Sequence, residues 1–228
     1  MSDSTVVEAA GARPVMVRAF RGVEELVANL ALAVMVLLPL AEIVVRPFFS
    51  GGIPGSISFV QHLTLWVGFL GAALAARDGK LIALATATFI PAGRARQVTE
   101  VFAAVVGTTV SAVLAAGAYE LVLFELEDGN TIAAGVPVWL AVAVIPVSFT
   151  LIALRLVWRA SPSWGGRTVA AIGIFIGYWL GTTDGVLASM PSWPLLSIVV
   201  VAAVLGAPIF TILGGAAVLL YMGDGDLP

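Results

Sequence analysis

The chain has no cysteine, a single histidine and few charges: charged residues make up 11% of its 228 residues, against roughly a quarter in a soluble domain. The absence of cysteine excludes disulfides, thiolate metal sites and thiol chemistry. The shortage of charge excludes a soluble globular domain, and a net charge of −3 offers no basic surface for nucleic acid. With 60% hydrophobic residues, the composition is that of a membrane protein.

Runs without any charged residue account for most of the length: 26–41, 47–76, 81–93, 101–119, 129–154, 168–183 and 185–223. A bilayer core of about 30 Å needs roughly 20 apolar residues, and all of these runs except 81–93 can supply a crossing. We therefore expect an all-α integral membrane protein with spans near 26–45, 57–76, 98–119, 134–154, 168–188 and 194–222. The short run 81–93 has helical apolar spacing and is expected to form an interfacial helix, flat on the cytoplasmic side.

Lysine and arginine are distributed unevenly between the two sides of these spans. Ten of the eleven lie before span one, after span two or between spans four and five, and only Arg46 lies on the opposite side. By the positive-inside rule both termini are cytoplasmic, and the acidic loop near 120–128 is outside. The apolar run starts late and no clear cleavage site follows it, so we expect span one to be retained.

Glycine and proline divide the chain further. The segment 160–167 (ASPSWGGR) resembles a linker, so we expect a cytoplasmic segment 1–25, a four-helix unit 26–160, a linker with one transmembrane helix 161–193, and a final part 194–228. Pro39 and Pro146 predict kinks in spans one and four. Gly206 and Pro208 predict a flexible or broken helix in span six.

Few polar side chains lie within or near the spans. Glu42 and Arg46 are one helical turn apart and favour a local pair at the outer end of span one, with an ion or substrate ligand as the alternative. His62, one turn before Trp66, is expected to hydrogen-bond between helices or to the outer loop, because a lone histidine supplies neither two haem ligands nor a histidine-rich metal centre. A proton relay through His62 is the alternative.

Arg77, Asp78 and Lys80 close span two and predict an interfacial cluster that holds this helix end against lipid headgroups, with Gly79 turning the chain. Gly173, Gly177 and Gly181 form a double G-x-x-x-G in span five, which favours close helix packing. The alternative is a chance pattern in an apolar helix. No Ser-His pair, paired carboxylates or phosphate-binding loop is present, so we expect no enzyme, no metal and no cofactor.

Residues 58–80 (SFVQHLTLWVGFLGAALAARDGK), with Arg46 before them and Pro91, Arg94 and Arg96 after them, resemble the small membrane subunit of TRAP (tripartite ATP-independent periplasmic) transporters. The similarity covers about residues 20–160. Acidic residues usual in the family near position 61 and in the flat segment are absent here. Residues 205–217 (LGAPIFTILGGAA) are similar to the first helix of the large subunit, so the chain resembles a small subunit fused to the start of a large one.

The resemblance implies sodium-coupled uptake of organic acids handed over by a periplasmic binding protein, with the large permease subunit moving the substrate and the small subunit as scaffold. The expected partners are these two proteins and membrane lipids. Under this interpretation span five is the seam between the small-subunit unit and the large-subunit part. A self-sufficient oligomeric transporter or channel, and a membrane-embedded enzyme or electron-transfer anchor, are the rival hypotheses, and both are disfavoured because spans three to five have almost no polar groups.

Overall fold

The computed structural model describes residues 15–48, 52–82, 93–183 and 185–223, and the secondary structure of this part of the chain is helical apart from one isolated bridge between Thr131 and Pro137. Four helical stretches are long and apolar enough to cross a membrane. They are Ala19–Val45 within α2 (Val15–Val45), α3 (Ser56–Asp78), α4 (Arg94–Asp128), and Val138–Arg159, which comprises α5 (Val138–Val142) and α6 (Val144–Arg159). The all-α membrane fold and the first four predicted spans are confirmed.

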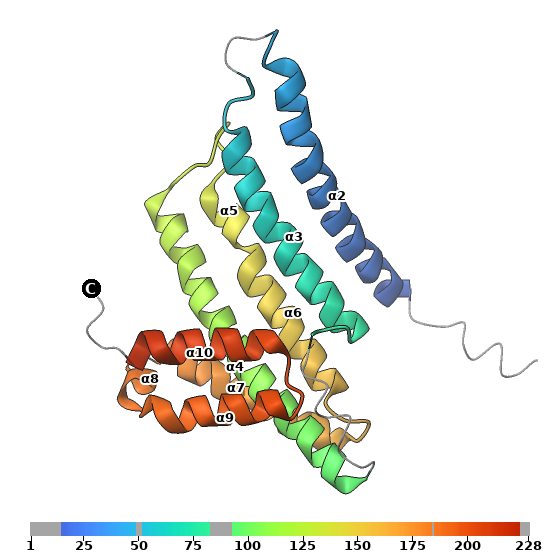
Figure 1. The fold of residues 1–228 in the computed structure, drawn as a ribbon, viewed down its shortest axis with the longest axis vertical. Coiled ribbons are helices and arrows are strands. Elements are labelled where there is room, and N and C mark those ends of the chain that lie inside the picture. The colour runs from blue at the N-terminus through green and yellow to red at the C-terminus, as the bar shows by residue number, and fades with distance from the viewer. Residues whose placement is uncertain (1–14, 49–51, 83–92, 184, 224–228) are drawn as a thin grey trace, which may run out of the picture.

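Helix α4 is the centre of the structure. Half of its most apolar stretch is buried, against 6% for the corresponding stretches of α2 and α3. Helices α2, α3 and α6 lie side by side, and α4 packs on the far side of α6 (Figure 1). Because α2 contacts mainly α3, most of its apolar side chains, such as Leu30, Leu37 and Ile43, are exposed and suit a lipid environment.

The interruption between α5 and α6 lies at Ala143, three residues before Pro146. Proline has no N–H to donate to the carbonyl four residues earlier, so the regular ladder ends there. The predicted interruption of span four near Pro146 is therefore observed. Pro39, by contrast, lies inside α2 without ending it.

Helix α7 (Trp164–Thr182) begins directly after α6, and the Ser163 side chain caps it by accepting a hydrogen bond from the Gly166 N–H. The connection between α6 and α7 is thus shorter than the expected linker 160–167. α7 ends before the predicted limit of span five, and a short helix α8 (Val186–Ser189) follows it. α7 is not one of the four stretches apolar enough to cross a membrane, so the predicted fifth crossing is not confirmed. The contact between α7 and α4 is the most extensive between any two described helices.

The sixth predicted span is two helices, α9 (Ser192–Val204) and α10 (Ile209–Gly223), which form an antiparallel hairpin against α4 (Figure 1). Gly206 adopts φ 99°, its N–H bonds to Ala203 O at 3.0 Å, and the Ala207 N–H bonds to Ala202 O at 2.8 Å. This is a Schellman motif followed by Pro208. The predicted break is confirmed, but at about 1.5 Å per residue neither helix alone spans the bilayer core, which differs from the expected single crossing.

Most of the predicted flat segment 81–93 lies outside the described residues. At its start, α3 ends in a second Schellman motif, with Gly79 at φ 70° and bonds from Gly79 N to Ala76 O and from Lys80 N to Ala75 O. The predicted turn at Gly79 is confirmed. The Ile209 N–H at the start of α10 donates to Ile82 O at 2.8 Å, so Ile82 is hydrogen-bonded to the hairpin.

Candidate functional site

A cluster of charged residues joins the first part of α2 to the ends of α3 and α6. Its centre is Glu24, which is 9% exposed. Arg155 of α6 donates a hydrogen bond to Glu24 Oε1, and Nη1 of Arg77 from α3 lies 3.5 Å from Glu24 Oε2. The latter two atoms form no hydrogen bond, so their contact is an ion pair at longer range. One buried carboxylate thus meets cations from two other helices.

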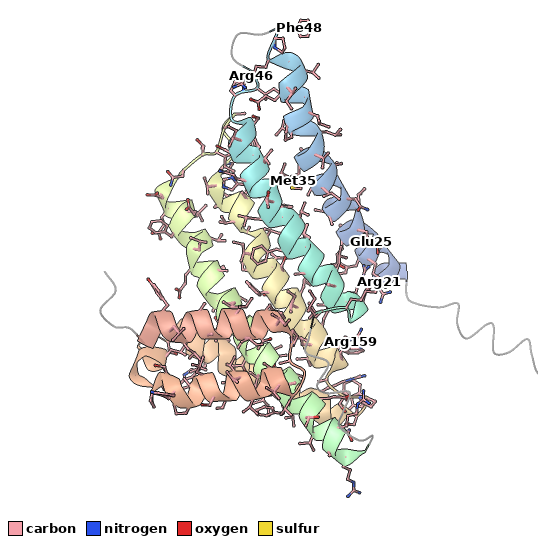
Figure 2. The ribbon with its side chains drawn as sticks, in the orientation of Figure 1. Arg21, Glu25, Met35, Arg46, Phe48 and Arg159 are labelled. Atoms are coloured by element: carbon pink, nitrogen blue, oxygen red, sulfur yellow. The ribbon has the colours of Figure 1, made fainter. Side chains whose placement is uncertain are left out.

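Further bonds extend the cluster. Arg77 pairs with Glu25 at 2.7 Å and with Asp78 at 3.2 Å. Arg155 also donates to the Ala73 carbonyl, and Arg159 donates to the Arg77 carbonyl at 3.2 Å. Figure 2 shows Arg21, Glu25 and Arg159 at this end of the bundle and Arg46 and Phe48 at the other. The cluster therefore fixes the relative height of three helices at one end.

The sequence analysis predicted that Arg77, Asp78 and Lys80 lie together against lipid headgroups. In the structure Arg77 and Asp78 belong to the cluster, and Arg77 faces carboxylates of α2. Lys80 takes part in no ion pair among the described residues. Sequence reasoning missed Glu24 and Glu25 and treated Arg155 only as a loop charge. The sequence did contain a signal. Glu24 and Glu25 directly precede the apolar run of span one, and Arg77 closes the next span, which runs antiparallel, so the three side chains lie at the same end.

The other end of α3 carries His62 and Trp66. The His62 Nδ1–H donates to Ser58 O at 2.7 Å, so the bond expected between helices is instead within α3. His62 comes four residues after Ser58 in the same helix, so its ring reaches the carbonyl of the preceding turn. Trp66 Nε1–H donates to Ala141 O at 2.9 Å, in α5 next to the break near Pro146. Trp66 therefore supplies the polar contact between helices that the sequence assigned to His62.

Glu42 and Arg46 share a backbone bond, Arg46 N–H to Glu42 O at 2.9 Å, but no side-chain ion pair joins them in the described structure. Arg46 is exposed, as expected for a side chain that reaches outward from a helix end. Glu42 lies instead against the following loop: a Cβ on Gly52 would be 3.3 Å from Glu42 Oε1. The local side-chain pair predicted here is therefore wrong.

The glycine stripe of α7 faces α4 at very short range. A Cβ on Gly173 would lie 2.7 Å from Val105 O, one on Gly177 would lie 2.7 Å from the Ala112 Cβ, and one on Gly181 would lie 2.8 Å from the Ala116 Cβ. The Thr108 hydroxyl of α4, fully buried, donates to Ala170 O of α7 at 3.0 Å. Small residues and one interhelical hydrogen bond are the usual means by which membrane helices associate.

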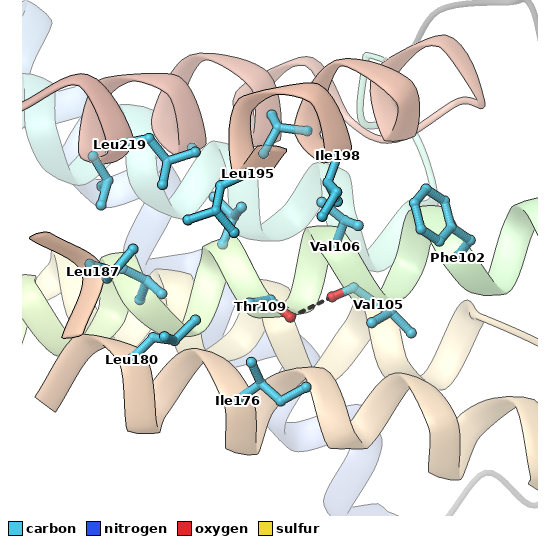
Figure 3. A pocket seen from close by; sticks show the side chains of 15 residues that line it. Phe102, Val105, Val106, Thr109, Ile176, Leu180, Leu187, Leu195, Ile198 and Leu219 are labelled. Atoms are coloured by element: carbon cyan, nitrogen blue, oxygen red, sulfur yellow. Dashed lines mark hydrogen bonds between the residues drawn. The ribbon is translucent and has the colours of Figure 1, made fainter. Parts of the chain in front are cut away.

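Helices α4, α7, α9 and α10, together with Leu187 of α8, line an open apolar cavity of about 310 Å³ (Figure 3). Nearly all of its lining is aliphatic or aromatic. Thr109 also lines it, and its hydroxyl is bonded to Val105 O at 2.9 Å within α4. A carboxylate or a cation in this cavity would have no partner, so the cavity cannot hold a charged substrate.

Two other buried hydroxyls, Ser148 Oγ and Thr211 Oγ1, have no hydrogen-bond partner among the described residues. No group of three or more His, Asp or Glu side chains that could hold a metal ion occurs in this part of the chain.

Comparison with known proteins decides the family. The family described as tripartite ATP-independent periplasmic transporters, DctQ component, matches residues 35–166, more than half of the chain. The chain belongs to the DctQ family. No curated protein and no solved structure matches it.

A DctQ component is a multi-pass membrane protein and part of a transporter, so this chain is a component of a TRAP transport system and not an enzyme. The match covers the end of α2, all of α3 to α6 and the first turn of α7. The rest of α7 and the hairpin α9–α10 lie beyond it. Trp66, Arg77 and Arg155 lie within the matched part, whereas Glu24 precedes it.

Proposed function

We propose that this chain is the small, scaffolding membrane subunit of a TRAP-type secondary transporter of the bacterial inner membrane, supporting sodium-coupled uptake of organic acids that a periplasmic binding protein delivers. The observation that carries the proposal is the DctQ match over residues 35–166, which covers α3 to α6 and the end of α2. The expected partners are the large permease subunit and the binding protein.

The scaffolding role is supported by the low polarity of α4 and of the cavity beside it. A transport path needs polar or charged groups that face a cavity within the membrane. The central helix α4 carries Thr and Ser hydroxyls that bond to nearby backbone carbonyls, and the cavity beside it is apolar. In this proposal the substrate therefore crosses through the large subunit.

We also propose that residues 194–228 are the start of a large-subunit portion, joined to the small-subunit unit 26–160 by α7. The similarity of residues 205–217 to a large-subunit helix supports this assignment. The glycine stripe Gly173, Gly177 and Gly181 is then the seam between the two portions, and its Cβ-free approach to α4 supports that role. The distribution of lysine and arginine favours a cytoplasmic N-terminus. The predicted cytoplasmic C-terminus requires a sixth crossing, which the antiparallel hairpin of α9 and α10 does not provide.

Uptake by proteoliposomes tests the function. Vesicles with this chain, a large permease subunit and the binding protein should accumulate an organic acid when an inward sodium gradient is applied. Vesicles with this chain and the binding protein alone should accumulate none. Sodium-dependent uptake by the chain without a large subunit would contradict the scaffold role and favour a self-sufficient oligomeric transporter.

A further inference from the structure

A second cavity, of about 450 Å³, opens beside the charge cluster between α2 and α6. Four arginines and one glutamate line it: Arg21, Arg77, Arg155, Arg159 and Glu24. The excess of positive charge favours an anionic occupant. Nothing in the scaffolding function requires a cavity of this size or sign.

The two inner arginines are already neutralised, whereas the two outer ones are not. Arg77 and Arg155 meet Glu24, Glu25 and Asp78. Arg21 and Arg159 meet no carboxylate among the described residues, and the one protein bond of Arg159 is to a backbone carbonyl, Arg77 O. Two guanidinium groups at one cavity are a suitable set of donors for a phosphate group, which they bind in a bidentate manner.

The same cavity has an apolar side. Phe20, Leu154 and Trp158 line it, and they are 52%, 54% and 64% exposed. The charge-free run of α2 begins at Leu26, so the cavity lies where the apolar span gives way to the membrane interface. An occupant that satisfies both sides has a phosphate at one end and an alkyl chain at the other.

We propose that this cavity binds an anionic phospholipid, with Arg21 and Arg159 as the ligands of the headgroup phosphate and with Leu154 and Trp158 against the acyl chains. Basic cavities between membrane helices at the interface are suited to such headgroups. The lipid then occupies the cleft between α2 and α6, two helices that otherwise meet through Glu24 and Arg155. This inference goes beyond the transport function and does not depend on it.

The test is a titration of the purified full-length chain in mild detergent, with the midpoint of thermal unfolding as the readout of binding. Phosphatidylglycerol should raise the midpoint at lower concentration than phosphatidylcholine. Arg21→Gln and Arg159→Gln should each weaken phosphatidylglycerol binding about fivefold, and the double variant about 25-fold. Arg46→Gln, at the opposite end of the bundle, is the matched control and should bind as the parent does.

Arg21 makes none of the cluster's bonds, so Arg21→Gln should unfold at the parental midpoint when no lipid is added. Arg159→Gln loses its hydrogen bond to Arg77 O, so the effect of the lipid is measured for each variant as the shift from its own lipid-free midpoint. Unchanged phosphatidylglycerol binding by the double variant would overturn the proposal, as would equal binding of phosphatidylcholine. Inorganic phosphate distinguishes the source of the anion: it should not match the stabilisation by the lipid. If phosphate alone gives the full effect, the cavity is a free-anion site and the assignment to a lipid is wrong.

Discussion

Glu24 and Arg155 are 131 residues apart in the chain, and the guanidinium of Arg155 donates directly to the Glu24 carboxylate. The other oxygen of this carboxylate lies 3.5 Å from Arg77, so a single side chain of α2 is shared by α3 and α6. Since α2 is otherwise packed mainly against α3, the contact with Arg155 links α2 to α6 as well.

Removing the charge of Glu24 should therefore destabilise the bundle more than removing that of its neighbour. Glu24→Gln leaves Arg155 and Arg77 without their shared anion, at a cost of about 3 kcal/mol in the free energy of unfolding. Glu25→Gln removes a carboxylate that is 53% exposed and should cost less than about 1 kcal/mol. Unfolding in mixed micelles with increasing sodium dodecyl sulfate measures both. Equal costs would show that burial of Glu24 gives it no special role.

Gly177 should not tolerate a side chain. A Cβ there would lie 2.3 Å from the backbone oxygen of Thr109, so Gly177→Ala must push α7 away from α4, at about 1–3 kcal/mol. Gly117 is a matched control on α4, because nothing lies within 4 Å of its Cβ position. Gly117→Ala should unfold at or above the parental detergent concentration. If Gly177→Ala does the same, α4 and α7 are not in the close contact described.

Trp66 should stabilise the join between α3 and α5 through its indole N–H. Trp66→Phe keeps the aromatic ring but leaves Ala141 O without this donor, and an interhelical hydrogen bond of this kind is worth about 1 kcal/mol. Trp193→Phe is the control, since Trp193 is 79% exposed. The difference between the two variants in unfolding midpoint is the measurement, and no difference would rule out a stabilising bond.

The orientation is open to a direct chemical test, because the chain contains no cysteine. A cysteine introduced at Asn130, in the loop that follows the acidic end of α4, should react with an impermeant maleimide in intact cells. A cysteine at Ser163, between α6 and α7, should react only after the membrane is permeabilised. The reverse pattern would invert the topology that the lysine and arginine distribution predicts.

The fold was largely predictable where hydrophobic runs are bounded by charge. Spans one to four needed only these boundaries, and the breaks near Pro146 and at Gly206–Pro208 followed from local backbone chemistry. The folding back of α10 on α9 was not predictable, because a broken helix crosses a membrane or reverses according to what packs on it. Here the packing partner is α4, which is distant in sequence.

The candidate site was less accessible to sequence reasoning. The pairing of Glu24 with Arg155 depends on the register of antiparallel helices, which no local pattern fixes. The bond of Trp66 likewise requires α5 to lie at a particular height beside α3. Glu42 and Arg46 had ideal spacing, but spacing alone does not decide whether a side chain turns to its helical neighbour or to the next loop.

The measurement that tests the central claim most directly is co-purification of the full-length chain with a large TRAP permease subunit, co-expressed and extracted in mild detergent. The account predicts one complex that contains both proteins on size exclusion. Omitting this chain should abolish sodium-driven uptake. A large subunit that purifies without this chain, and transports with its binding protein at the same rate in its absence, would contradict the role proposed here.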